Sequence, residues 1–151
     1  MRSPLQHPRA IFSSTEVLGR LKAAGLGSLQ GTAAEILADS VRKVICPRKL
    51  GTAEWVRIIK EAHALGIPST ATIMYGSYET AKERAEHLGI FRDIQDETNG
   101  FTELVSLTYI HTNTPLYKKG IARAGATGRE DLLMIAVSWL FLDNFKNIQV
   151  P

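Results

Sequence analysis

The sequence predicts an α/β fold in which about four parallel strand–helix units form half of a (β/α)8 barrel. Short strands rich in β-branched residues alternate with helices, and this spacing favours a parallel sheet with right-handed crossovers. The last predicted helix is apolar almost all round and therefore needs cover on several sides. A complete barrel takes about 200 residues or more, whereas this chain has 151. We therefore expect a fragment of a barrel, or a product that lacks its first half.

The first helix is predicted from a capping box, in which Ser13 is followed three residues later by Glu16. Gly25 ends this helix, because glycine readily adopts the left-handed conformation of a helix C-terminus. The apolar stripe of the helix is expected to consist of Val17, Leu21 and Ala24.

A short strand is predicted at residues 26–29. Thr32 and Glu35 form a second capping box, which predicts a helix that ends at Pro47. The inner face of this helix is expected to consist of Leu37, Val41 and Val44.

Thr52 is predicted to cap the next helix, which Gly66 ends. The uncharged segment Ser69–Tyr75 predicts a buried strand, and Gly76-Ser77 turns the chain into a helix at 79–97. The inward residues of these two helices are expected to be Trp55, Ile59 and Ala62 in the first and Ala81, Ala85, Leu88 and Phe91 in the second.

Asn99-Gly100 predicts a loop before a strand at 104–110, and residues 111–127 show no clear period. Thr127 and Glu130 form a further capping box, which predicts a helix at 131–142. A strand at 148–150 is expected to follow.

Composition excludes several classes of protein. The formal charge of +3 is mild and the basic residues are scattered, so we expect no nucleic-acid partner. No apolar run approaches the roughly 20 residues that a membrane span requires. The single cysteine, Cys46, excludes an intrachain disulfide and fits a cytoplasmic protein. Arginine and serine without acids in the first fifteen residues leave an organelle protein as the alternative.

The segment from Gly25 to Gly31 resembles the dinucleotide-binding pattern G-x-G-x-x-G, but its last glycine comes one residue late. A dinucleotide-binding module therefore stays open as an alternative. Glu35 has two interpretations, as part of a helix cap or as a ligand group at the carboxyl end of a barrel strand, where barrel enzymes place their sites. The spacing alone favours the cap.

Gly76 follows a strand end, so it either allows a ligand to approach the backbone or only makes a turn. His111 follows the next predicted strand and is the candidate catalytic residue, although a lone histidine there is more often structural. His63 and His87 are expected to pack beside the core. No His, Cys or carboxylate pair has metal-ligand spacing, so no metal site is expected.

Several long segments together resemble the tyrosine-transferring half of deazaflavin (FO) synthase, a radical enzyme that uses S-adenosylmethionine (SAM). They run from Leu21 to Gln149 and read LKAAGLGSLQGTAAEILADSVRKVICP, EWVRIIKEAHALGIPSTATIMYGSYET, HLGIFRDIQDETNGFTELVSL, PLYKKGIARAGATGRE and NIQ. Radical enzymes of the menaquinone pathway share part of this pattern. NGFTELVSL and IHTNTPLY bring the resemblance closer to deazaflavin synthase.

The resemblance implies a domain at 21–151, the C-terminal half of a radical SAM barrel, preceded by a divergent segment at 1–20. It also implies a four-iron, four-sulfur cluster and SAM as cofactors, with L-tyrosine and 5-amino-6-(D-ribitylamino)uracil as substrates. The residues implied to bind SAM are Gly31, Thr32, Glu35, Ile73, Tyr75 and Gly76. The residues implied to border the substrates are Thr108, His111 and Tyr117.

The chain also departs from the family pattern. The cluster of the family is held by a Cys-x3-Cys-x2-Cys loop, and Cys46 alone cannot form it. The family has a histidine at the position of Ser77 and tends to have an acid near Asn113. We therefore expect an enzyme-derived chain that is inactive alone and has a cluster-bearing half as its partner. The alternative in a different class is a non-catalytic interaction module.

Overall fold

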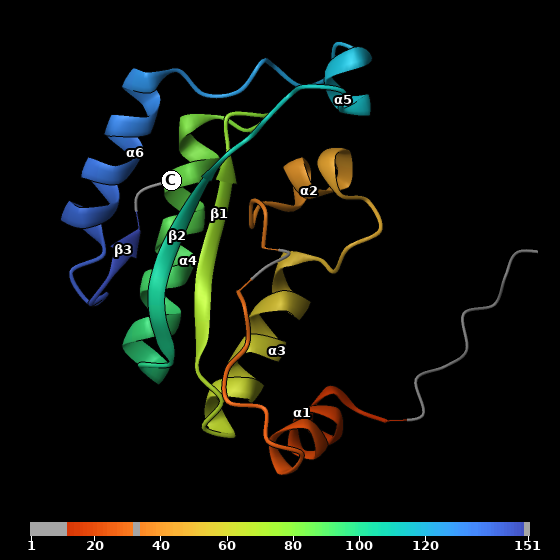
Figure 1. The fold of residues 1–151 in the computed structure, drawn as a ribbon, viewed down its shortest axis with the longest axis vertical. Coiled ribbons are helices and arrows are strands. Elements are labelled where there is room, and N and C mark those ends of the chain that lie inside the picture. Colours follow the sequence, from red (N-terminus) through yellow and green to blue (C-terminus); the bar gives the residue numbers. More distant parts are fainter. Residues whose placement is uncertain (1–11, 32–33, 150–151) are drawn as a thin grey trace, which may run out of the picture.

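The computed structural model describes residues 12–31 and 34–149 of the chain. Three helices precede the first strand, helical segments connect the strands from there on, and Figure 1 shows their arrangement. The helices are α1 (Ser14–Ala23), α2 (Asp39–Ile45), α3 (Thr52–Ala64), α4 (Ala81–Thr98), α5 (Pro115–Lys118) and α6 (Gly128–Phe141). The strands are β1 (Ser69–Tyr75), β2 (Phe101–Thr108) and β3 (Ile148–Gln149).

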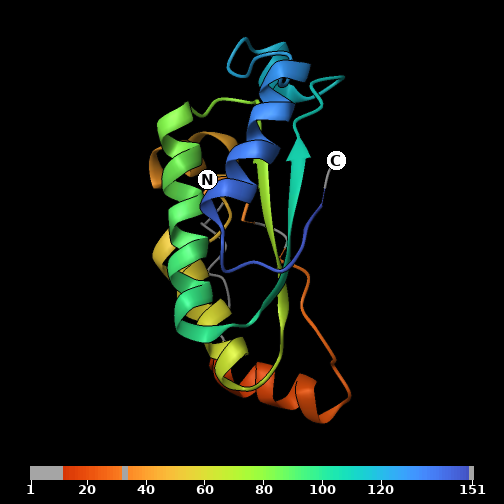
Figure 2. The same ribbon diagram turned by 90° about the vertical axis from the view of Figure 1, so that its left-hand side faces the viewer.

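The three strands form one parallel sheet in the order β1-β2-β3. Tyr75 pairs with Thr108 at the carboxyl ends of β1 and β2, and Leu104 pairs with Ile148 of β3. The crossovers contain α4 and α6, and both helices lie on one face of the sheet (Figure 2). Because side chains alternate along a strand, the opposite face carries residues such as Val105 and Leu107, and Leu107 is 44% exposed.

The strand predicted at Ser69–Tyr75 is confirmed, as are the capping boxes of Ser13 with Glu16 and of Thr127 with Glu130. The prediction of four strands is wrong among the described residues, because 26–29 forms only an isolated bridge from Leu29 to Ser69. The α/β class and the parallel sheet are confirmed, with three strands in place of four.

The helix predicted to begin at Thr32 begins later. Thr32 lies outside the described residues, and Glu35 lies in a bend with φ 48 before α2 starts at Asp39. The Asp39 carboxylate accepts hydrogen bonds from the backbone N–H and the hydroxyl of Thr52. Thr52 is therefore the first residue of α3, and Gly51 occupies the N-cap position.

The helix predicted at 79–97 begins at Ala81 because Thr80 and Glu83 form a capping box. The two residues of this box stand three apart in the sequence, the spacing of a capping box. Ala81 and Ala85, predicted to point inward, are exposed, whereas Leu88 and Phe91 are buried as expected. In α1 the predicted stripe is also wrong, since Val17 and Leu21 are exposed and Leu18 is the buried residue.

The strand predicted at 104–110 is β2, which begins three residues earlier, at Phe101, and ends two residues earlier, at Thr108. It begins at Phe101, which Gln95 holds by accepting from its backbone N–H and donating to its carbonyl. The predicted loop at 111–127 contains the short helix α5, capped by the Thr114 hydroxyl. The end of the strand predicted at 148–150 lies outside the described residues.

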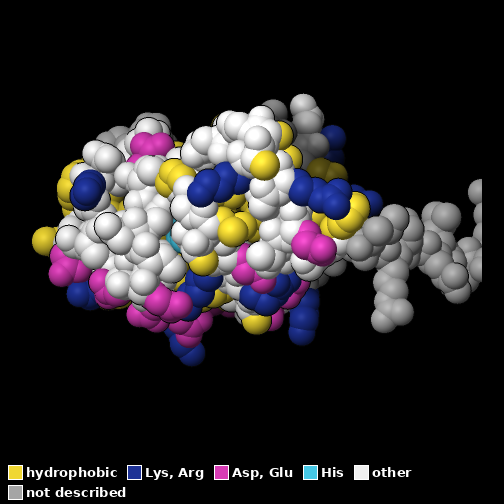
Figure 3. Space-filling model, turned by 90° about the horizontal axis from the view of Figure 1, so that it is seen from below, with side chains coloured by type: hydrophobic (Ala, Val, Ile, Leu, Met, Phe, Trp, Pro, Cys, Tyr) yellow, Lys and Arg dark blue, Asp and Glu magenta, His cyan; other side chains and the backbone are white. Residues whose placement is uncertain are grey.

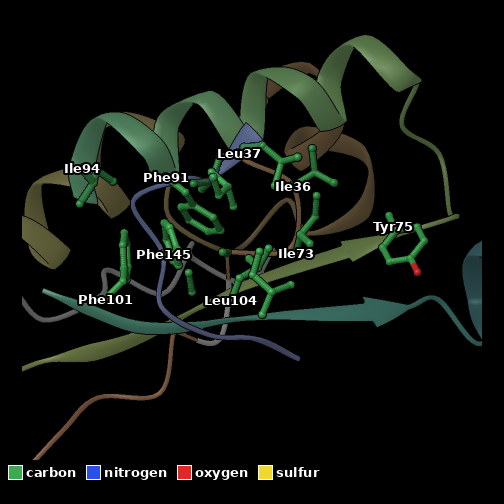
Figure 4. Close-up of a cluster of buried hydrophobic side chains, with 14 of the residues drawn as sticks. Ile36, Leu37, Ile73, Tyr75, Phe91, Ile94, Phe101, Leu104 and Phe145 are labelled. Atoms are coloured by element: carbon green, nitrogen blue, oxygen red, sulfur yellow. The ribbon is translucent and has the colours of Figure 1, made fainter. Parts of the chain in front are cut away.

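The core lies between the sheet and the helices and is built around Phe91 of α4 (Figure 4). The Phe91 ring centroid lies 5.8 Å from that of Trp55, 5.3 Å from that of Phe101 and 4.3 Å from that of His87. The stripe predicted for α3, of Trp55, Ile59 and Ala62, is confirmed as buried. Burying side chains of this size supplies about 1.5–3 kcal/mol each.

His87 is fully buried on α4, and its Nδ1 accepts a hydrogen bond of 2.8 Å from the backbone N–H of Leu37. Burial lowers the pKa of His87 to about 3. The folded protein therefore keeps this imidazole neutral, whereas an unfolded chain protonates it below a pH of about 6.5. His87 ties the segment before α2 to α4 only in its neutral form.

We expect the free energy of unfolding to be highest above pH 6.5 and to fall as the pH drops from 6.5 toward 3. The slope from His87 is at most about 1.4 kcal/mol per pH unit. Urea unfolding at several pH values should show a steeper loss in wild type than in His87→Asn, which keeps an acceptor but does not titrate. Parallel profiles for the two proteins would rule out this role of His87.

The last helix was expected to need cover on several sides, but α6 buries only Met134 and Ser138. Leu140 is 85% exposed and Leu132 is 71% exposed.

Seen from below, basic and acidic side chains are interspersed with apolar ones on the face that Figure 3 shows. Within the described residues, no helix is long and apolar enough to cross a membrane.

Candidate functional site

The carboxyl ends of β1 and β2 lie side by side and carry most of the residues that the resemblance implies. Tyr75 ends β1 opposite Thr108 of β2, and the loops that follow these strands meet there, since the Ser77 carbonyl accepts from the backbone N–H of Arg123. In parallel α/β folds, ligands bind at this end of the sheet.

Glu35 lies against the end of β1, because its carbonyl accepts a hydrogen bond of 3.0 Å from the backbone N–H of Met74. Its carboxylate is ion-paired with Lys49. The buried Arg42 fixes this segment by donating to the carbonyls of Ala34 and Ile36 on either side. Glu35 thus lies outside any helix and is not the capping residue that its spacing favoured.

Gly31 packs directly on β1. Its N–H donates to the Thr70 hydroxyl at 2.7 Å, and its carbonyl accepts from the Thr72 hydroxyl at 2.6 Å. A Cβ at this position would lie 1.6 Å from the Thr70 carbonyl oxygen. The close approach of two backbones therefore explains this glycine without a ligand.

The side chains of Ile73 and Tyr75 are fully buried on the helix side of the sheet (Figure 4). They belong to the core, so only their backbone atoms are placed to line a ligand site. Gly76, with φ 91, makes the turn after β1, and a Cβ there would lie 2.5 Å from the backbone nitrogen of Ala126. The turn interpretation of Gly76 thus has a direct structural basis.

The sequence analysis missed Glu79, which fills the turn after β1. Its carboxylate accepts from the backbone N–H groups of Gly76 at 2.6 Å and Ser77 at 3.0 Å, and lies 3.2 Å from Arg84 Nε. Arg84 in turn pairs with Glu130 at 3.1 Å. The signal was an acid two residues after a Gly-Ser turn, a position from which a carboxylate can reach back to the backbone.

Thr108, implied to border the substrates, points to the helix side and contacts Asp131 of α6. The Asp131 carboxylate accepts from the Tyr75 hydroxyl at 2.7 Å and from the Thr108 hydroxyl at 2.8 Å. Burial and the contact with Asp131 raise the pKa of Tyr75 to about 12. This cluster joins β1, β2 and α6, and Asp131 is a further residue that sequence reasoning missed.

His111 and Tyr117 lie together beyond the end of β2, with ring centroids 4.5 Å apart. The His111 carbonyl accepts from the hydroxyl of Thr114, which caps α5, and Tyr117 is 42% exposed. The structure therefore joins these two predicted residues to each other. Among the described residues it also brings Glu35 and Gly76 to the end of β1.

The donor set does not fit an iron–sulfur cluster. Within the described residues, no group of three His, Cys, Asp or Glu side chains is placed to hold a metal ion. The one cysteine of the chain, Cys46, is partly buried, and burial raises the pKa of its thiol. Three thiolates are needed to hold the cluster that the resemblance implies.

The glycines from Gly25 to Gly31 do not form a dinucleotide-binding turn. Gly25, with φ 99, ends α1, and the next described helix starts only at Asp39. Backbone N–H groups of a helix N-terminus are therefore not presented directly after the last glycine, as that motif requires. His63 bonds to Thr98 and Ser69 beside the core, as its packing interpretation predicted.

The fold defines an α/β chain with a parallel three-stranded sheet, and the candidate site residues gather at the carboxyl ends of β1 and β2. Comparison shows what it is similar to. It is 66% identical over 142 residues to the 5-amino-6-(D-ribitylamino)uracil--L-tyrosine 4-hydroxyphenyl transferase of Methanosphaerula palustris, covering 94% of this chain and 39% of the relative. The transferase of the same name from Methanocaldococcus jannaschii is 56% identical over 135 residues, covering 89% and 38%.

The enzyme of that name from Methanoculleus marisnigri is 64% identical over 141 residues, 93% of this chain and 38% of the relative. No protein-family model matches the chain. The resemblance to the tyrosine-transferring half of deazaflavin synthase is therefore confirmed as a partial match. The chain spans less than two fifths of the length of these relatives.

Proposed function

We propose that this chain is part of a deazaflavin-forming radical SAM transferase. In its complete form this enzyme would move the 4-hydroxybenzyl group of L-tyrosine onto 5-amino-6-(D-ribitylamino)uracil. The observation that carries the proposal is the 66% identity over 94% of the chain to a transferase named for these two substrates. Identity this high over nearly the whole chain supports a shared fold and a shared site.

The proposed fold is the C-terminal half of a (β/α)8-type barrel. The consecutive parallel strand order and the two helical crossovers support it, because each crossover adds a strand on the same side. The partly exposed sheet face with Leu107 would then line the interior of the closed barrel. The remaining strands would correspond to the parts of the relatives that lie outside the matched residues.

SAM is proposed to lie along the loop from Gly31 to Glu35 and the end of β1. There the Glu35 carboxylate would accept hydrogen bonds from hydroxyl groups of SAM. The hydrogen bond from the Met74 N–H to the Glu35 carbonyl fixes the backbone of this residue. His111 and Tyr117 are proposed to border the substrates, with His111 as the candidate for proton transfer. When bound, SAM and its cluster would supply the radical, but the cluster would have to be held by residues outside this chain, since Cys46 alone cannot hold it.

A chimera tests this proposal. The matching segment of the Methanosphaerula palustris transferase is replaced by the 142 aligned residues of this chain. After reconstitution with iron and sulfide, the chimera should form the hydroxybenzyl adduct of the uracil, which mass spectrometry detects. A chimera that folds and holds its cluster but forms no adduct would contradict the proposal.

The chain by itself should release no 5′-deoxyadenosine from SAM. The reason is the donor set, because one cysteine cannot supply three thiolates. Purified protein treated with iron, sulfide, a reductant and SAM is analysed by chromatography, with the chimera as the positive control. Release of 5′-deoxyadenosine above the protein-free background would contradict this prediction.

An interaction module is the second candidate, and the uncovered helix α6 favours it. Such a module would keep the fold and pair with a cluster-bearing half without contributing to catalysis. Co-purification with that half, together with full activity when His111 is replaced by alanine in the assembled enzyme, would support the module over the catalytic part.

A further inference from the structure

The segment that carries His111 and Tyr117 is anchored to the sheet through Tyr109. This residue follows β2, its side chain is buried, and its backbone N–H donates to the Tyr75 carbonyl at 2.8 Å. The loop before α6 lies against it, because a Cβ at Gly125 would be only 2.6 Å from the Tyr109 carbonyl oxygen. Tyr109 therefore gives the segment a fixed start at the carboxyl end of the sheet.

The hydroxyl of Thr114 joins this anchor to both predicted residues. It donates to the His111 carbonyl at 3.0 Å and accepts from the Tyr117 N–H at 3.4 Å. It also contacts the Tyr109 hydroxyl. Because the single hydrogen of the Thr114 hydroxyl goes to His111, the Tyr109 phenol is the donor in this contact. The three bonds use the one donor and both acceptor positions of the Thr114 hydroxyl.

The backbone supports the same arrangement. The Thr114 N–H also donates to the His111 carbonyl at 3.0 Å, and Asn113, with φ 63, makes the turn between them. Asparagine adopts this left-handed conformation more readily than most residues. Beyond α5, the N–H of the buried Ala122 donates to the Leu116 carbonyl at 3.2 Å. Both ends of α5 are therefore held in place.

The two rings meet because of this backbone and not because of bonds of their own. The His111 and Tyr117 rings have centroids 4.5 Å apart and an interplanar angle of 60°. Within the part of the chain that the structure describes, neither side chain forms a hydrogen bond or an ion pair. His111 stands three residues before Thr114 and Tyr117 three residues after it. The position of one ring relative to the other thus depends on Thr114.

We propose that Thr114 is a positioning residue, whose hydroxyl holds the His111 imidazole against Tyr117 in the orientation that proton transfer needs. The catalytic consequence rests on the proposed function, in which His111 is the candidate for proton transfer. Without the hydroxyl, the Tyr109 phenol and the Tyr117 N–H lose their partner and the His111 carbonyl keeps only one donor, so the rings separate. A displacement of about 1 Å in a reacting group costs up to about a hundredfold in rate.

Nuclear magnetic resonance of the imidazole protons tests this geometry in the chain, without any catalytic activity. His111→Asn assigns the resonance among the four histidines. The Tyr117 ring current should displace it, and Tyr117→Leu should remove the displacement. Thr114→Ala should remove it as well, whereas Thr114→Ser, which keeps the hydroxyl, should retain it. A resonance that Tyr117→Leu does not move, or a displacement that persists in Thr114→Ala, would overturn the proposal.

Ser13→Ala is the matched control for the loss of a helix cap. Ser13 is also a hydroxyl cap, but it caps α1, which lies at the opposite end of the molecule from α5 (Figure 1). Loss of a capping hydroxyl destabilises the helix in either variant. The His111 resonance should stay in place in Ser13→Ala. An equal change in both variants would show a general loosening of the fold and would reject the specific role of Thr114.

The chimera tests the catalytic part. Thr114→Ala should lower kcat for adduct formation by about tenfold or more with little change in KM, and Thr114→Ser should restore most of the rate. In a His111→Ala background, Thr114→Ala should cause no further loss, because it acts through His111. Losses that multiply in the double variant would reject the positioning role.

An inactive chimera with the wild-type sequence at these positions would contradict the proposed function alone. The resonance of His111 in the chain then still decides whether Thr114 sets the contact between the two rings. A failure of the positioning role is therefore seen separately from a failure of the proposed function.

Discussion

Replacement of Glu79 by alanine should lower the free energy of unfolding by about 3–5 kcal/mol, the range for removing one partner of a buried ion pair. The Glu79 side chain has no exposed surface and accepts from three backbone N–H groups of the turn after β1. Its loss leaves those donors without an acceptor and removes one of the two ion pairs that the described residues give Arg84, whose side chain is 16% exposed.

Urea unfolding followed by circular dichroism measures this loss. Glu79→Gln keeps one acceptor oxygen but removes the charge opposite Arg84. Its free energy of unfolding should therefore lie between those of Glu79→Ala and wild type. Glu86→Ala is the matched control, since Glu86 is an exposed helix residue paired with Lys82 at 3.7 Å. Glu86→Ala should lower the free energy of unfolding by no more than about 0.5 kcal/mol. Equal losses for Glu79→Ala and Glu86→Ala would show that the turn does not depend on Glu79.

Much of the fold could be predicted from local signals. The strand Ser69–Tyr75 was found because an uncharged run of β-branched residues has few other structures available. The capping boxes at Ser13 and Thr127 were found because such a box is a local pattern, although the last helix begins at Gly128 and not at the predicted residue 131. The stripe of α3 was found because its period matches the helix.

The errors arose where tertiary contacts decide the local structure. Thr32 and Glu35 match a capping box, but Arg42 and His87 hold residues 34–37 outside the helix, so α2 starts later. Thr52 matches a cap, but the Asp39 carboxylate from another element takes both of its donors. A local pattern does not contain a partner that lies far away in the sequence.

The candidate site shows the same limit. The position of Gly76 follows from its place directly after the predicted strand Ser69–Tyr75, whereas Glu35 reaches the end of β1 through its carbonyl, which accepts from Met74 N–H. That Ile73 and Tyr75 point into the core follows from the alternation along β1, once the face covered by α4 is known. Asp131 could not be foreseen, because its contact with Tyr75 and Thr108 depends on how α6 packs on the sheet.

The substitution Gly31→Ala should also be strongly destabilising, by about 3 kcal/mol, because it overpacks a site that backbone atoms already fill. The added Cβ would lie 1.6 Å from the Thr70 carbonyl oxygen and 2.4 Å from its carbonyl carbon. No side chain can move aside there, so Gly31 must shift away from β1. Its hydrogen bonds with the hydroxyls of Thr70 and Thr72 would then be lost.

Gly27→Ala is the matched control, because a Cβ at Gly27 meets no atom within 4 Å. Urea unfolding of both variants should show a loss only for Gly31→Ala, and hydrogen exchange should show weaker protection along β1 in that variant alone. Gly31 is also implied to border SAM, so a stable Gly31→Ala protein that only loses SAM affinity in the chimera would assign the glycine to the ligand. A large loss of stability in the chain without SAM would instead assign it to the packing of the loop on β1, which is the result that the 1.6 Å approach predicts.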